Sequence, residues 1–146
     1  MSRYLLIGGA GVFAIHTIAY LLDQPDTEKV ISVGRNIERS PAYTLNIGRG
    51  DTRYAYHQFH FNFEQDRLLD LIDKEQPDYI INYAAIAYAT SWENAHRYYE
   101  TNLMSVVRLC EALYSRKFLK KFIQIGTSEL YGSVQKPADE KHPIYP

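Results

Sequence analysis

The chain has 146 residues, of which 46% are apolar, and a formal net charge of −1, as is typical of a globular domain with its own hydrophobic core. Lys and Arg are interspersed with Asp and Glu, which argues against nucleic acid as a partner. No apolar run approaches the roughly 20 residues of a membrane helix, and the short apolar start lacks the features of a signal peptide. We therefore expect no membrane partner and a cytoplasmic location.

Short apolar runs alternate with segments of helical periodicity along the whole chain, which indicates a parallel sheet with helices on its faces. Because crossovers between parallel strands are right-handed, we expect a Rossmann-like, doubly wound α/β/α fold with strand order 3-2-1-4-5. The predicted strands lie near residues 3–8, 29–34, 55–61, 78–83 and 121–126. A ligand should bind where the carboxyl ends of these strands diverge.

The first predicted strand leads into the turn Gly8-Gly9-Ala10-Gly11 and then into a helix over residues 12–22. Backbone N–H groups and the positive end of a helix dipole meet there, and together they suit a pyrophosphate. Gly8, Gly11, Val12 and Phe13 are therefore candidate cofactor-binding residues. Ala14 stands where a third glycine would be most diagnostic, so a tight turn that binds nothing is the alternative.

The second predicted strand ends in Gly34-Arg35-Asn36, without the acidic residue that usually accepts hydrogen bonds from the adenosine ribose of NAD. Arg35, helped by Arg39, could instead bind a 2′-phosphate, which favours NADP over NAD. The alternative is that Arg35 is an ordinary solvated loop charge. The polar stretch that follows, up to Arg53, is expected to be a loop with a short helix.

The third and fourth predicted strands end beside further candidate cofactor-binding residues. Asn62 and Phe63 could hold the adenine, although Asn62 could equally cap the helix that ends before Pro77. Ala84, Ala85 and Ala87 follow the fourth strand. A long helix from Trp92 to about Ser115 comes next, with Thr90 and Glu93 as a possible capping box.

Four stretches resemble the extended short-chain dehydrogenase/reductases, the NAD-dependent epimerase/dehydratase family that acts on nucleotide sugars. They are Gly8-Gly9-Ala10-Gly11, Asn82-Tyr83-Ala84-Ala85, Tyr99-Glu100-Thr101-Asn102 and Gly126-Thr127-Ser128-Glu129-Leu130-Tyr131-Gly132. The last is similar to GDP-mannose 4,6-dehydratases and UDP-glucuronate decarboxylases, whereas dTDP-glucose 4,6-dehydratases carry Asp at the position of Ser128. The resemblance implies a nucleotide-sugar substrate and adds Asn102 to the candidate cofactor-binding residues.

The resemblance also implies catalytic roles for Thr127, Ser128 and Glu129. Thr127 matches the residue that hydrogen-bonds the 4-oxygen of the sugar as it becomes a carbonyl, and Glu129 matches the carboxylate that removes the C5 proton in dehydratases. Plain 4-epimerases usually carry a small residue at the position of Glu129, which favours dehydration or decarboxylation. From the residues alone, this run could equally be a polar strand end before a turn.

The chain spans the dinucleotide-binding domain of such an enzyme, residues 1–146, and stops before the Ser-Pro-Tyr-x-x-x-Lys stretch and the sugar-binding domain of the resembled family. We expect an N-terminal fragment that is inactive alone; a natural, non-catalytic dinucleotide-binding protein is the alternative. The resemblance further implies a homodimer formed through the long helix. The lone Cys110 and the spacing of the histidines predict no metal site.

Overall fold

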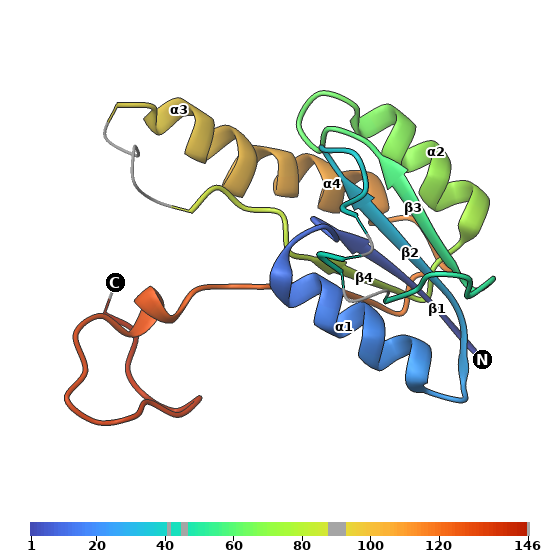
Figure 1. Cartoon of the computed structure of the whole chain (residues 1–146). Helices are drawn as coiled ribbons and strands as arrows, with labels where there is room; N and C mark the ends of the chain where they lie inside the picture. The colour runs from blue at the N-terminus through green and yellow to red at the C-terminus, as the bar shows by residue number, and fades with distance from the viewer. Residues whose placement is uncertain (41, 45–46, 88–92, 146) are drawn as a thin grey trace.

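The computed structural model describes residues 1–40, 42–44, 47–87 and 93–145. The core is one parallel sheet in the order β3-β2-β1-β4-β5, which confirms the predicted doubly wound topology. Helix α1 covers one face of the sheet, and α2 and α4 cover the other (Figure 1). The strands are β1 Ser2–Ile7, β2 Thr27–Gly34, β3 Tyr54–Gln58, β4 Tyr79–Asn82 and β5 Lys121–Gln124.

The helices between the strands follow the predicted alternation. The short α3 runs through a π-helical segment, η1, directly into α4, so that the predicted long helix is interrupted by wider turns. Its predicted start at Trp92 and the Thr90 cap lie outside the described residues. The helical elements are α1 Val12–Asp23, α2 Gln65–Glu75, α3 Ala95–Tyr98, η1 Tyr99–Met104, α4 Ser105–Leu113 and a 3₁₀ turn, η2 Ser128–Tyr131.

Two apolar layers hold the helices to the sheet, because successive strand residues point to opposite faces. Leu6 and Val30 pack with Ile18 under α1, whereas Leu5 and Ile31 face the layer under α2 and α4. All of these side chains are almost completely buried. The interior of β1 and β2 is therefore apolar on both sides, as the continuous apolar runs in the sequence predict.

Two local predictions were wrong. Asn62 does not cap α2: Glu64 occupies the cap position and accepts a 2.6 Å hydrogen bond from the His60 N–H through its side chain. The described part of the stretch from Gly34 to Arg53 contains turns but no helix. Asn62 was predicted as a cap because it lies just before α2 in the sequence, but its side-chain amide forms a hydrogen bond with Thr101 of η1.

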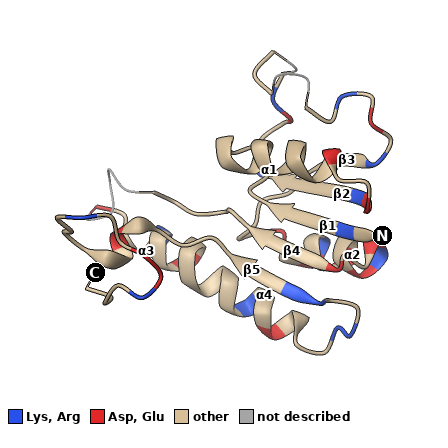
Figure 2. Cartoon of the chain, turned by 90° about the horizontal axis from the view of Figure 1, so that it is seen from below, with Lys and Arg blue, Asp and Glu red and all other residues tan. Residues whose placement is uncertain are grey.

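Charged side chains gather at the amino ends of the strands, opposite the predicted ligand end of the sheet (Figure 2). The Glu75 carboxylate, at the end of α2, lies 2.6 Å from Arg3 Nη2 and 2.7 Å from Lys29 Nζ. Burial raises the pKa of Glu75. The hydrogen bond and charge of Lys29 and the charge of Arg3 lower it by more, so the pKa of Glu75 lies below its usual value. This edge is thus held by ion pairing.

Candidate functional site

The turn after β1 brings the backbone unusually close to the chain that leaves β4. Gly8 has φ of +81°, and a Cβ added to it would lie 2.7 Å from the backbone nitrogen of Ala84. The N–H groups of Gly8 and Gly9 both donate to the Val33 carbonyl, at 2.8 and 3.0 Å. Only glycine fits this position, because both the backbone angle and the close approach exclude a side chain.

The turn delivers the start of α1 to the carboxyl end of the sheet. Gly11 is the N-cap residue, no side chain caps the helix, and no acidic residue occupies its first turn. The N–H groups of Val12, Phe13 and Ala14 have no acceptor within the helix. The side chains of Val12 and Phe13 are 55% and 79% exposed, so these residues could hold an anion through the backbone alone. Ala14, fully buried, keeps the helix close to the strand.

A cleft of about 490 Å³ opens beside this turn, at the carboxyl ends of β1 to β4. Most of the predicted cofactor-binding residues line it together: Gly8, Gly11, Arg35, Asn36, Asn62, Phe63, Ala84 and Ala85. The predicted residues outside this lining are Val12, Phe13, Ala87, Asn102, Thr127, Ser128 and Glu129. The structure therefore brings together residues from four strand ends that are far apart in the sequence.

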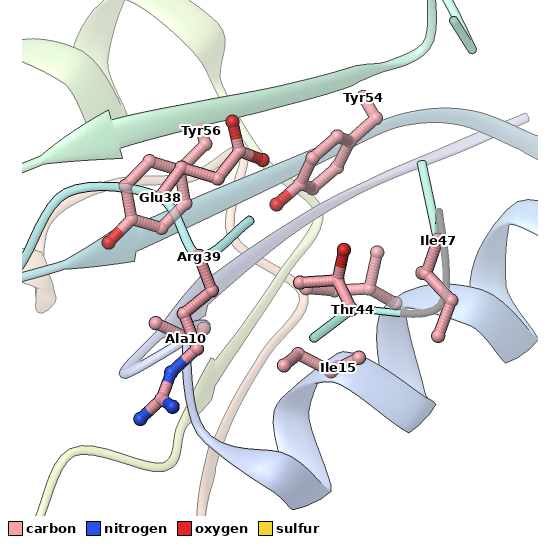
Figure 3. Close-up of a pocket in the computed structure, with 10 residues that line it drawn as sticks. Ala10, Ile15, Glu38, Arg39, Thr44, Ile47, Tyr54 and Tyr56 are labelled. Carbon is pink, nitrogen blue, oxygen red and sulfur yellow. The ribbon is translucent and has the colours of Figure 1, made fainter. Parts of the chain in front are cut away.

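The loop after β2 brings two arginines to the cleft but leaves its acidic residue outside the cleft lining. Arg35, Asn36 and Arg39 line the cleft. Arg39 also lines, together with Glu38, a small pocket of about 10 Å³ under the glycine turn, and its guanidinium carbon lies 4.0 Å from the centroid of the Tyr43 ring. In Figure 3 the Glu38 carboxylate points toward Tyr54 and Tyr56, while Arg39 extends away from it past Ala10. The cleft wall at the end of β2 is consequently cationic.

Two tyrosines of β3 support this loop. Burial raises the pKa of Tyr54 to about 12, with the charge of Glu38 acting in the same direction. Burial and Glu38 also raise the pKa of Tyr56, whose hydroxyl donates a 2.6 Å hydrogen bond to the Asn36 carbonyl. Both phenols stay protonated at neutral pH, so Tyr56 can act as the donor that fixes the loop backbone.

Asn62 links the loop after β3 to the helix across the cleft. Its Nδ2 donates a 2.7 Å hydrogen bond to Thr101 Oγ1, and its Oδ1 accepts one from Ser105 Oγ at 3.3 Å. The adjacent Phe63 is 80% exposed and lies in the cleft lining, with its ring centroid 4.5 Å from that of His60. An apolar ring is thus presented to the cleft beside a fixed amide.

Asn102 holds the chain that leaves β4. Its Oδ1 accepts a 2.8 Å hydrogen bond from the Ile86 N–H, and its Nδ2 donates to the Ile86 carbonyl at 3.0 Å. Asn82 contributes at the other end, where its Oδ1 accepts from the Ala84 N–H at 3.0 Å. Asn102 therefore acts on the cleft through the backbone next to Ala84 and Ala85 rather than by lining it.

The cleft residues that were not identified as such from the sequence include His96 and Arg97 of α3, and Glu100 and Thr101 of η1. The sequence placed them on a helix, but it gave no sign of which helix face meets the cleft. The carboxylate of Glu100 pairs with Arg108. Arg97 adds a third guanidinium to the cleft wall.

The predicted catalytic residues lie apart from this cleft, at the end of β5. Thr127 caps the turn η2, and its Oγ1 accepts a 3.3 Å hydrogen bond from the Glu129 N–H. Thr127, Ser128 and Glu129 are exposed, and the segment after β5 extends away from the sheet (Figure 1). The three residues follow the end of β5, as the sequence predicts, but they do not line the cleft.

Within the described ranges, no group of three or more His, Cys, Asp or Glu side chains could hold a metal ion. Nor is any helix in this part of the chain long and apolar enough to cross a membrane. The groups that the cleft and the adjoining start of α1 offer a ligand include backbone N–H donors, arginine side chains and small apolar side chains.

A family model described as the NAD dependent epimerase/dehydratase family matches residues 4–146. The chain belongs to this family. Its glycine turn packs against β2 and the chain that leaves β4, and α1 begins directly after it. The parallel five-stranded sheet of this chain is the Rossmann-like fold of the family.

Relatives of this family member catalyse more than one reaction. The chain is 26% identical over 134 residues to a dTDP-D-glucose 4,6-dehydratase of Dictyostelium discoideum, covering 91% of this chain and 30% of that protein. It is 36% identical over 87 residues to a GDP-mannose 4,6-dehydratase of Yersinia enterocolitica, covering 57% and 23%. Other curated relatives are UDP-glucose 4-epimerases of Pisum sativum and Halalkalibacterium halodurans.

Solved structures agree on the fold. The crystal structure of a UDP-glucose 4-epimerase from Bifidobacterium longum, in complex with NAD+ and UDP, matches with a TM-score of 0.82 and 24% identity. The match covers 99% of this chain and 43% of that one. The chain therefore spans less than half the length of these relatives and structures.

Proposed function

We propose that this chain binds NADP(H) in the cleft. The glycine turn and the first N–H groups of α1 would hold the pyrophosphate, which supports roles for Gly8, Gly11, Val12 and Phe13. Asn62 and Phe63 would hold the adenine, against the small side chains of Ala84 and Ala85 and the chain continuing to Ala87. Asn102 would keep that chain in place. The observation that carries the proposal is that one cleft is lined together by Gly8, Gly11, Asn62, Phe63, Ala84 and Ala85.

The preference for the 2′-phosphate of NADP is supported by the loop after β2. Arg35 and Arg39 line the cleft, whereas Glu38 faces Tyr54 and Tyr56 in the pocket beneath the turn. A carboxylate that could accept hydrogen bonds from the ribose of NAD is thus absent from this wall, and Asn36 offers an amide in its place. Titration with NADPH and NADH tests the preference: tighter NADH binding would contradict it.

We further propose that the full-length protein is a nucleotide-sugar 4,6-dehydratase. A nicotinamide held in the cleft would supply the hydride acceptor for the C4 alcohol of the sugar, and the tyrosine of a Tyr-x-x-x-Lys stretch, as in the resembled family, would take the proton of the C4 hydroxyl. Oxidation at C4 acidifies the neighbouring C5–H, so Glu129 can remove that proton while the C6 hydroxyl leaves as water. Thr127 would donate a hydrogen bond to the C4 oxygen. Ser128 would contribute a second hydroxyl beside it.

The reaction class is tested by incubating the full-length protein with a panel of nucleotide sugars. A 4-keto-6-deoxy product supports dehydration, and release of CO₂ supports decarboxylation. A C4 epimer without either would remove the role proposed for Glu129, and the epimerases among the relatives make this the second candidate. In the dehydratase case, Glu129→Gln should abolish product formation but leave NADPH affinity unchanged.

For the 146-residue chain alone we propose dinucleotide binding without turnover. The exposed position of Thr127, Ser128 and Glu129, outside the cleft lining, supports this. A non-catalytic dinucleotide-binding protein would look the same, and the coding sequence downstream of Pro146 distinguishes the two: an in-frame Tyr-x-x-x-Lys supports the enzyme. Turnover by the purified chain would contradict the proposal.

We also propose that the protein forms a homodimer through the outer face of η1 and α4. Tyr99, Leu103 and Val107 are spaced four residues apart and are 66%, 49% and 39% exposed. Large exposed side chains of this kind on one continuous helical segment form an apolar surface that a second copy could cover. Sedimentation of the parent and of Val107→Asp tests it, with a monomeric parent as the contrary result.

A further inference from the structure

The arginines of this chain differ in whether a carboxylate neutralises them. Arg3, Arg53, Arg67, Arg108 and Arg116 each form an ion pair. In the described part of the chain, no carboxylate lies within ion-pair distance of Arg35, Arg39 or Arg97, and the residues outside that part include no Asp or Glu. All three of these arginines line the cleft. The cleft therefore concentrates guanidinium groups that the protein itself does not neutralise.

Arg97 belongs to a different wall of the cleft from the other two. Arg35 and Arg39 come from the loop after β2, whereas Arg97 lies on α3, four residues before Thr101. Arg97 and Thr101 both line the cleft, and Thr101 contacts Asn62 at 2.7 Å. Arg97 therefore lies on the same cleft wall as the residue that contacts the loop carrying Phe63.

The space beside that loop suits a flat aromatic group. Phe63 is 80% exposed and lines the cleft together with the small side chains of Ala84 and Ala85. An exposed guanidinium that is planar and weakly hydrated stacks readily on an aromatic face, where the attraction is about 0.5–2 kcal/mol. The glycine turn supplies N–H groups for the pyrophosphate, so that group does not require Arg97.

We infer that Arg97 covers the adenine ring of the bound dinucleotide and is a further affinity-determining residue of the site. The inference rests on the dinucleotide binding proposed above. It separates the arginines by role: Arg35 and Arg39 select the 2′-phosphate, whereas Arg97 binds the base, which is common to NAD and NADP. Substitution of Arg97 should therefore lower affinity without changing the preference between the two dinucleotides.

The experiment is calorimetric titration of the 146-residue chain and its Arg97→Ala variant with ADP and with 2′,5′-ADP. Both ligands should bind the variant about 2- to 30-fold more weakly, by the same factor, from the stacking range above. Arg97→Lys should recover only a minor part of the loss, because an ammonium lacks the planar surface. Arg49→Ala, which removes an arginine outside the cleft lining, should bind both ligands like the parent.

Three outcomes would overturn the inference. They are unchanged ADP affinity in Arg97→Ala, a loss confined to 2′,5′-ADP, and full recovery in Arg97→Lys. Matching melting temperatures of parent and variants exclude unfolding as the cause of a loss. If the parent chain binds neither these ligands nor NADPH, the proposed dinucleotide binding fails as well, which is distinct from failure of the role of Arg97.

Discussion

The close approach of Gly8 to Ala84 gives a prediction whose two physical parts can be measured separately. In Gly8→Ala, the methyl group must tolerate φ of +81°, which costs roughly 1–2 kcal/mol. It must also fit 2.7 Å from the Ala84 nitrogen, which is backbone and cannot swing aside; such overpacking costs about 1–3 kcal/mol. We expect the free energy of unfolding to fall by about 2–5 kcal/mol.

Gly50 provides the matched control for this experiment. Its φ is +76°, but nothing lies within 4 Å of an added Cβ, so Gly50→Ala should lose only the backbone part, about 1–2 kcal/mol. Urea unfolding of the parent and both variants gives the difference directly. Gly8→Ala should also weaken NADPH binding, whereas Gly50→Ala should not. The reasoning is refuted if the two variants are equally stable and bind NADPH equally well.

Three further predictions concern other parts of the molecule. Arg35→Ala should reduce the preference for NADPH over NADH about 10- to 100-fold in paired titrations, since a charge-assisted hydrogen bond contributes about 1.5–3 kcal/mol; an equal loss for both ligands would count against a 2′-phosphate contact. Glu75→Gln should cost about 1–3 kcal/mol near neutral pH by denaturant unfolding. Because the pKa of Glu75 is depressed on folding, its contribution is present above pH of about 4.5 and is lost as pH falls through the folded-state pKa, so the difference between parent and variant should vanish in acid; a constant difference would contradict this. Asn102→Ala removes both hydrogen bonds to Ile86 and should weaken dinucleotide binding several-fold in calorimetry. The free energy of unfolding should fall by only about 1 kcal/mol, because the residue is exposed. Unchanged binding would show that the chain after β4 keeps its position without Asn102.

The strand order and the cleft position were predictable because they depend on patterns that each segment carries alone. Continuous apolar runs identify buried parallel strands, and chirality then leaves few ways to connect them. The end of each strand follows from the same pattern, which is why Gly8, Arg35 and Ala84 could be assigned to one edge of the sheet before any coordinates. These predictions required no knowledge of side-chain contacts.

Predictions that depend on which partner a side chain chooses were less accurate. Asn62 has the chemistry of a helix cap and stands near a helix start, yet its amide bonds to Thr101 in a segment 39 residues away. Arg97 has no local feature that distinguishes it from a solvated helix residue. Its place in the cleft depends on the rotation of α3 about its axis, and α3, which has no buried residue, continues directly into η1.

The π-helical segment sets that rotation. A residue in an α-helix advances the side chain by about 100°, so a single residue added or removed between α4 and α3 turns one helix relative to the other by that angle. Deleting one residue of η1 between Thr101 and α4, to restore regular α-helical turns, should leave the face of α4 on the sheet but turn Arg97 and Thr101 away from Asn62. The width of one helical turn thus decides which side chains of α3 a ligand in the cleft can meet.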